Sequence, residues 1–481
     1  MILCCLEPTT QEMTMADDLA GATFTELLAA FRDCFTAPSY ANFCALLLGW
    51  VHCLGRRTIT AVALASGVLG RRHISALHRF FGRARWELDA VGRVTFELAL
   101  QAHPKDQPML LVLDDTLARK RGKCVSLASM HHDPLLSSPG KGFCSFGHVW
   151  VILAVWLSLP MQPQRGYALP VAFRLFVGSR RGGQRDAASR RTAGQRQRCA
   201  QAAASSVPPT TKLELARELL DMVSSWAPER TFYVVADSLY AGRAVLEHRP
   251  ANVELISRLR LDAALWTPPA PRRPGQNGRP RRRGSRLPSP QTLTATRRHW
   301  HRLNLTLYGR AVSPLVFRLT ALWYIAQRSQ PVRIVVVRDP TGRRRDEAFF
   351  CTDCRASAAF ILASYARRWT LEVAFHDVKQ CLGFEDPQNQ TPLAVRRTAP
   401  LAFVSYDLVL LSAATCARQG QPVSWLHRPW YRSKSAPSFA DMLTAVRLAT
   451  WPRLALFDPP SRSRRRKNWP PPWPHALLAS A

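Results

Sequence analysis

The sequence predicts an α/β protein in which a mixed β-sheet is flanked by helices, preceded by a helical region and interrupted by a β-rich insertion. Two apolar runs predict the sheet, because Met109–Leu113 and Thr231–Ala236 have the composition of strands buried on both faces, and aspartate follows each of them. The segment Lys212–Trp226 predicts a flanking helix, since its leucines recur at helical spacing. Helix and strand patterns therefore alternate along the middle of the chain.

Composition points to a polyanionic partner. The 481 residues include 66 basic and 33 acidic side chains, which gives a net charge of +33. Nucleic acid is the first candidate for such a basic chain, and an acidic membrane surface is the second. The apolar runs Val149–Leu159 and Leu401–Cys416 are too short to span a bilayer and are predicted to be core elements. The N-terminus lacks the features of a signal peptide, so a cytoplasmic protein is expected.

The first 102 residues are predicted to form a helical DNA-binding domain. Within it, two short helical patterns flank Gly67–Gly70, and the segment Thr58–Trp86 has the outline of a helix-turn-helix. Arg71 and Arg72 open its basic second half and are candidate DNA contacts. The alternative is an ordinary helical domain with a basic face.

The first part of the predicted catalytic domain covers residues 103–253. The strand Met109–Leu113 is expected to end at Asp114 and Asp115, where carboxylates can reach a cleft. Strand-like runs at Gly142–Leu159 and Ala168–Val177 follow, so the sheet is expected to begin with antiparallel strands.

A second acidic residue, Asp237, directly follows the strand Thr231–Ala236. For each of these aspartates the alternative is a strand-ending turn, since aspartate favours turns.

The rest of the chain is divided by composition. Residues 254–348 are predicted to be a β-rich insertion, 349–418 the second part of the catalytic domain, and 419–481 a basic tail. Within the insertion, Pro271–Trp300 holds nine arginines and no acidic residue, which predicts disorder until it meets a polyanion. The polar stretch Gly178–Thr211 is predicted to be a mobile linker.

The stretch Tyr365–Lys379 contains the candidate functional residues of the second part of the catalytic domain. On one helix, Tyr365, Arg368, Glu372 and Lys379 would share a face within roughly 60°. A carboxylate can hold a divalent metal ion, and the two cations can hold phosphate. The alternative is an amphipathic surface helix whose charged side faces water.

This spacing, Tyr-x2-Arg-x3-Glu-x6-Lys, resembles the signature of bacterial insertion-sequence transposases of the DDE superfamily. The resemblance extends from Met109 to Pro387 in the right order, and it implies a ribonuclease-H-like fold. It implies that Asp237, Glu372 and the aspartate directly before Thr116, which is Asp115, are catalytic and bind Mg²⁺, for which Mn²⁺ can substitute. Asp114 is the alternative for the first position.

The same resemblance implies the partners. These are double-stranded DNA, as the inverted-repeat ends of an element and as target DNA, and a second copy of the chain in a synaptic homodimer beside the bacterial nucleoid. Arg368 and Lys379 would hold phosphate beside Tyr365. A tryptophan of the insertion stacks on a flipped base in relatives, and Trp266 and Trp323 are candidates.

Two alternatives to a transposase remain open at this point. One is a domesticated or decayed copy that only binds DNA. The other is a ribonuclease-H-like nuclease that cuts without strand transfer.

Overall fold

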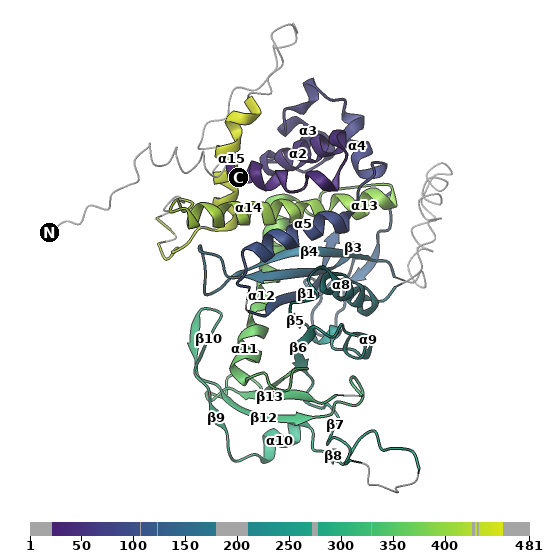
Figure 1. The fold of residues 1–481 in the computed structure, drawn as a ribbon, viewed down its shortest axis with the longest axis vertical. Helices are drawn as coiled ribbons and strands as arrows, with labels where there is room; N and C mark the ends of the chain where they lie inside the picture. Colours follow the sequence, from purple (N-terminus) through teal and green to yellow (C-terminus); the bar gives the residue numbers. More distant parts are fainter. Residues whose placement is uncertain are drawn as a thin grey trace, which may run out of the picture.

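The computed structural model describes residues 22–455, apart from 106, 123, 179–209, 272–277, 329, 426–428 and 431. The predicted leader, most of the predicted linker and the last part of the predicted basic tail lie outside the described residues. The described chain is a mixed α/β structure in which helices from both ends of the sequence cover one large sheet (Figure 1).

The large sheet has ten strands in the order β2-β3-β1-β5-β6-β14-β13-β12-β9, and β4 pairs with β3 beside this path. Their bounds are β1 Met109–Arg119, β2 Ser129–His132, β3 Cys144–Leu157, β4 Tyr167–Phe176, β5 Phe232–Ala236, β6 Val253–Leu259, β9 His301–Arg302, β12 Leu315–Ala321, β13 Val332–Arg338 and β14 Glu347–Cys351. Four short strands form two small separate sheets, β7 Leu265–Trp266 with β8 Arg286–Leu287, and β10 Leu305–Leu307 with β11 Arg310–Val312.

At the centre of the sheet, β1 runs antiparallel to β3 and parallel to β5, and β5 runs parallel to β6. The strand β1 is longer than predicted, since it continues to Arg119 instead of ending at the aspartates. Beyond the aspartates, the side chains of Thr116 and Ala118 are buried on one face of the strand. This alternation of side chains between the two faces continues the strand past Asp115. Asp114 and Asp115 therefore lie in the middle of a strand.

The β-rich insertion extends the large sheet. Its strand β13 pairs with β12 and β14, and β14 pairs with β6, so the sheet is continuous from β1 into the insertion. The prediction of disorder across Pro271–Trp300 is wrong for its described part. Pro290–Thr296 forms helix α10, which Ser289 caps by accepting a hydrogen bond from the Thr292 amide, and β8 precedes it.

Helices from both ends of the sequence pack against one another and against the sheet (Figure 1). The N-terminal helices are residues 22–29, α2 Ala37–His52, α3 Ile59–Ala65, α4 Ile74–Gly82 and α5 Leu88–Gln101, with the 3₁₀ turns Arg32–Cys34 and Val68–Gly70. The later helices are α8 Lys212–Trp226, α9 Arg243–Leu246, α11 Ala358–Arg367, α12 Trp369–Leu382, α13 Pro392–Thr398, α14 Pro400–Arg418 and α15 Phe439–Ala455, with the 3₁₀ turn Ser238–Tyr240. α2 packs on α14 and α15, and α4 packs on α13.

The helix α14 packs at the centre of the helices from both ends of the sequence. The stretch Pro392–Arg418 is long and apolar enough to cross a membrane, but 94% of its apolar window is buried inside the protein. α14 contacts β4, α12 and α15, so it is a core element, as its sequence predicted.

The single helix predicted around Glu372 is two helices that meet at Arg368. α11 ends at Arg367 and α12 begins at Trp369, while Arg368 keeps helical backbone angles between them. α12 ends at Gly383, whose φ of 58° is in the left-handed region that favours glycine.

Candidate active site: carboxylates around Arg368

Two carboxylates from distant parts of the chain share one guanidinium group. The Nη1 atom of Arg368 lies 2.7 Å from Asp114 Oδ2 and 2.6 Å from Glu372 Oε1. Asp114 lies on β1, and Glu372 lies in the first turn of α12. The junction of α11 and α12 therefore places the Arg368 cation and the Glu372 carboxylate beside the central strand of the sheet.

Asp237 is placed beside this pair by strand register. The β1–β5 pairing sets Leu113 against Ala236, so Asp114 and Asp237 are the next residues along two parallel strands. Asp237 keeps an extended backbone, and its Oδ1 accepts a hydrogen bond of 2.7 Å from the Ser238 amide. Residues in register on adjacent strands point to the same face, so Asp237 belongs to the face of Asp114.

Asp115 points to the other face of β1, because successive side chains of a strand alternate. Its Oδ2 accepts from Lys212 Nζ at 2.6 Å, and its Oδ1 accepts from the Tyr240 hydroxyl at 2.8 Å. The structure thus brings Asp114, and not Asp115, to Glu372, although sequence analysis preferred Asp115.

Burial controls the charge on Asp114. Burial raises the pKa of Asp114 to about 7, although the Arg368 cation acts in the opposite direction. The charges of Asp114 and Glu372 outweigh burial at Arg368 and raise its pKa. Once Asp114 is ionised, above about pH 7, the Arg368 cation faces two carboxylates and compensates only part of their charge.

This imbalance fits an additional cation. Oxygen ligands from carboxylates suit Mg²⁺ or Mn²⁺, and the carboxylates nearest this point are those of Asp114, Asp237 and Glu372. Within the part of the chain that the structure describes, no three acidic, histidine or cysteine side chains are close enough together to hold a metal ion. Arg368 lies between Asp114 and Glu372, so its guanidinium group would have to yield for both to bind one ion.

Two tyrosines flank the carboxylates. The Tyr365 ring packs 4.7 Å from that of Phe349, and the Arg368 guanidinium lies 5.9 Å from the Tyr365 ring centroid. Tyr308 was missed in the sequence. It stands at the tip of the β10–β11 hairpin with a φ of 53° and 60% exposure.

The charges of Arg368 and Glu372 act on the Tyr308 hydroxyl, whose pKa is raised mainly by burial. A Tyr-Gly pair between two short alternating segments is a turn signal that sequence analysis could have used.

The two candidate tryptophans have other neighbours. The Trp266 ring is 4.8 Å from the Arg283 guanidinium and 6.1 Å from the Tyr324 ring. Trp323 packs edge-on against Phe350 at 5.3 Å.

Lys379 lies apart from Arg368 and Glu372, near the end of α12. Its pKa is lowered, chiefly by burial, while the charges of Glu385 and Asp133 oppose the shift. Glu385 accepts a hydrogen bond from the Arg119 amide at 3.1 Å, so this group surrounds the far end of β1.

Arg71 and Arg72 lie in the turn between α3 and α4. The two helices flank Gly67–Gly70, as predicted, but α4 begins only at Ile74. Arg72 Nη1 donates to Asn42 Oδ1 at 2.8 Å, which holds Arg72 against α2, whereas Arg71 is exposed.

Comparison with known proteins identifies the class of this chain. A family described as DDE superfamily endonuclease matches residues 30–310, which is more than half of the sequence. The chain therefore belongs to this family. The matched range includes Asp114, Asp115 and Asp237, and it ends before Glu372.

A solved structure is also similar to this chain. It is a cryo-EM structure of a piggyBac transposase synaptic complex with hairpin DNA, which aligns with a TM-score of 0.39 at 10% sequence identity. The alignment covers 94% of this chain and 83% of that one. No curated protein matches the sequence.

Proposed function

We propose that this protein is a transposase that cuts DNA at the ends of an insertion sequence and joins the resulting 3′-hydroxyl groups to target DNA. The observation that carries the proposal is the set of Asp114, Asp237 and Glu372 on one face of the sheet, with Arg368 between two of them. Asp114 lies on β1, Asp237 directly follows β5, and Glu372 lies on α12, in the chain order that the resemblance to DDE transposases implies.

A ribonuclease-H-like core is part of the proposal, and the strand order supports it. Along the path β4-β3-β1-β5-β6, β3 runs antiparallel to both of its neighbours, β4 and β1, and the last two strands run parallel to β1. The Tyr-x2-Arg-x3-Glu-x6-Lys spacing, from Tyr365 to Lys379, supports assignment to the bacterial insertion-sequence branch.

The proposed cofactor is Mg²⁺, held by Asp114, Asp237 and Glu372. When bound, such ions activate the attacking oxygen and stabilise the leaving oxygen of a phosphodiester. The three carboxylates would hold the ion in place of their present contact with Arg368, whose planar guanidinium group could then contact the phosphate. Lys379 lies farther along α12 and would contact a phosphate away from the cut.

The proposed partners are the inverted-repeat ends of the element and target DNA, bound by a synaptic homodimer in the bacterial cytoplasm. The net charge of +33 supports a nucleic-acid partner. The basic helix α4, which exposes His78 and Arg79, supports a DNA-binding role for the helical region.

Cleavage of the element's own terminal repeats tests the proposal. Purified full-length protein is given end-labelled repeat duplexes with Mg²⁺, Mn²⁺ or a chelator, together with a supercoiled target plasmid. Asp114→Asn, Asp237→Asn and Glu372→Gln should each lower cleavage by about 10³-fold or more, because charge stabilisation is lost at the reacting phosphate.

The matched control is Asp115→Asn, one residue along β1 on the other face, which should keep measurable cleavage. Cleavage that persists in chelator, or at the normal rate in Asp114→Asn, would overturn the assignment. Cleavage without joined plasmid product would favour the nuclease that lacks strand transfer.

A further inference from the structure

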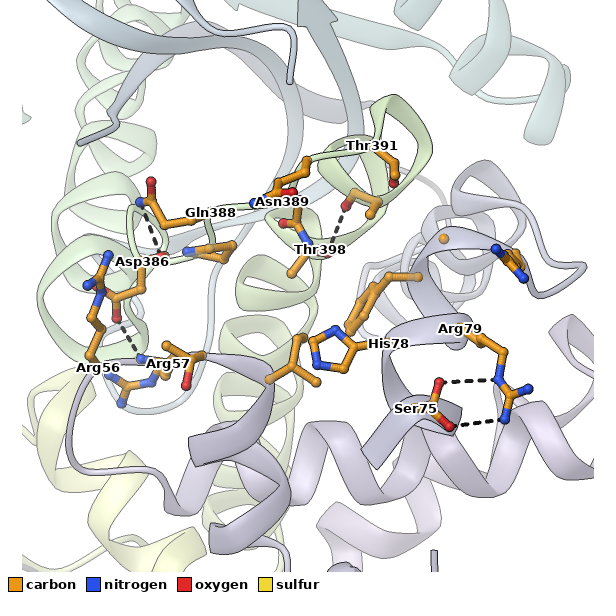
Figure 2. Close-up of a pocket in the computed structure, with 18 residues that line it drawn as sticks. Arg56, Arg57, Ser75, His78, Arg79, Asp386, Gln388, Asn389, Thr391 and Thr398 are labelled. Carbon is orange, nitrogen blue, oxygen red and sulfur yellow. Dashed lines mark hydrogen bonds between the residues drawn. The ribbon is translucent and has the colours of Figure 1, made fainter. Parts of the chain in front are cut away.

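A basic cleft lies between the N-terminal helices and the segment that follows α12. It has a volume of about 730 Å³, and α4, the turn before α3 and residues 386–391 form its walls (Figure 2). Sequence analysis placed residues 386–391 within the second part of the catalytic domain, 349–418, and gave them no role. The cleft is thus built from two segments that lie some 300 residues apart.

The walls of the cleft carry an excess of positive charge. Arg56, Arg79 and Arg83 line it and are exposed. Among the described residues that line it, Asp386 is the one carboxylate, and its Oδ2 already accepts a hydrogen bond of 2.9 Å from the Arg57 amide. The Arg79 guanidinium donates to the carbonyl and hydroxyl of Ser75 on its own helix. The cleft therefore favours an anion that can meet guanidinium groups at several points of its wall.

The opposite wall, residues 386–391, is polar beyond Asp386 and is held in place by hydrogen bonds. Gln388 Oε1 accepts from the Gly122 amide at 2.9 Å, and the Asn389 carbonyl accepts from the Ser126 amide at 3.0 Å. These bonds fix the 386–391 segment to the loop that follows β1. Its side chains Asn389 and Gln390 offer amide donors and acceptors of the kind that contact phosphates and base edges.

The cleft is rigidly connected to the carboxylate site. Trp50 Nε1 donates to the Leu382 carbonyl at 2.8 Å, and Arg57 donates to the Cys381 carbonyl, so both contacts hold the end of α12. Glu372 stands ten residues before Leu382 on this helix. At 1.5 Å per residue that is about 15 Å, or roughly five base pairs of duplex DNA.

We infer that this cleft binds the phosphate backbone of the same DNA duplex whose end enters the carboxylate site, about five or more base pairs from the cut. Arg56, Arg79 and Arg83 contact successive phosphates, and Asn389 and Gln390 face the opposite side of the backbone. The inference rests on the proposed function for the identity of that duplex.

Salt dependence of DNA binding tests the role of the arginines. Full-length protein and the Arg56→Ala/Arg79→Ala/Arg83→Ala variant are titrated onto a fluorescent 30-base-pair duplex of random sequence, between 50 and 200 mM KCl. Each lost phosphate contact should reduce the slope of log affinity against log salt by roughly 0.9. The slope of the triple variant should therefore be smaller in magnitude than that of the wild type by about 2 to 3. At the lowest salt its affinity should fall roughly tenfold or more.

The matched control removes the same charge elsewhere. Arg93→Ala/Arg217→Ala/Arg418→Ala changes three arginines on α5, α8 and α14 that do not line the cleft. Its slope should stay within about 1 of the wild-type value. Equal slopes for the cleft variant and the wild type would overturn the inference.

Substitution of one exposed neutral residue gives a second test that does not depend on removing arginines. Gln390→Glu should weaken DNA binding and Gln390→Lys should tighten it, each by roughly three- to tenfold. The corresponding pair at the exposed Gln419, beyond the end of α14, is the control. Changes of the same sign at Gln390, or no change, would contradict a phosphate backbone in the cleft.

The outcomes separate this inference from the proposed function. If the wild type cleaves its repeats while the cleft variants bind DNA normally, the cleft inference fails alone. If the cleft variants lose affinity but Glu372→Gln still cleaves, the cleft inference stands and the proposed active site fails.

Discussion

Asp114→Asn should remove a pH-dependent penalty from the stability of the metal-free protein. The folded pKa of Asp114 is raised to about 7 by burial, from an ordinary value of 3.8. An acid with a raised folded pKa binds its proton more tightly in the folded state, so stability is lost as pH rises from about 4 to about 7. Above pH 7 the loss is complete.

The size of the penalty follows from the shift. Each pKa unit corresponds to 1.36 kcal/mol, so a shift of about three units amounts to about 4 kcal/mol. Asparagine has nearly the same shape and cannot ionise, but it loses the ion pair with Arg368. We therefore expect Asp114→Asn to be less stable than or equal to the wild type at pH 4.5, and more stable by about 1–4 kcal/mol at pH 8.

The assay is urea denaturation in the presence of chelator at pH 4.5, 6, 7 and 8, followed by circular dichroism. A second series with Mg²⁺ tests the role of the carboxylate as a ligand. Mg²⁺ should stabilise the wild type at pH 8 and stabilise Asp114→Asn less, while Asp115→Asn should keep the wild-type response. Parallel profiles of unfolding free energy against pH for the wild type and Asp114→Asn would show that the pKa of Asp114 is not raised in the folded protein.

Three further changes test the packing around the site. Asp407 is fully buried on α14, neither of its carboxyl oxygens has a described hydrogen-bond partner, and burial raises its pKa well above 3.8. Asp407→Asn should therefore raise the free energy of unfolding by about 1–3 kcal/mol at pH 8, with little gain at pH 4 in the same urea titrations. Trp50→Phe loses the donor to the Leu382 carbonyl and should lower thermal stability by about 1–3 kcal/mol, which scanning calorimetry would detect. Gly383→Ala would place a Cβ 2.1 Å from Asp386 Oδ2 at a φ of 58°, so it should cost at least 1–2 kcal/mol in denaturation experiments, and an unchanged midpoint would argue against this helix end.

The local pattern of the sequence determined most of the secondary structure. Apolar runs predicted β1 and β5, leucine spacing predicted α8, and the two short helices on either side of Gly67–Gly70 were expected. These predictions succeed because strand and helix periodicity depend on neighbouring residues only. Asp237 at the end of β5 was placed correctly for the same reason.

Tertiary contacts decided what local pattern could not. The choice between Asp114 and Asp115 depends on which face of β1 meets α12. The local sequence around the two aspartates does not determine that face. The break at Arg368 and the separation of Lys379 from Glu372 follow from how two helices dock on the sheet.

Tertiary contacts also decided the structure of the described part of Pro271–Trp300. Its composition predicted disorder, yet Thr294 is buried, and its carbonyl accepts a hydrogen bond from Arg338 of β13. The sequence by itself determined the acidic and basic residues, their order and the strands and helices that carry them. Only the tertiary structure decided which of them meet, because strand register and helix docking are set by contacts between residues far apart in the chain.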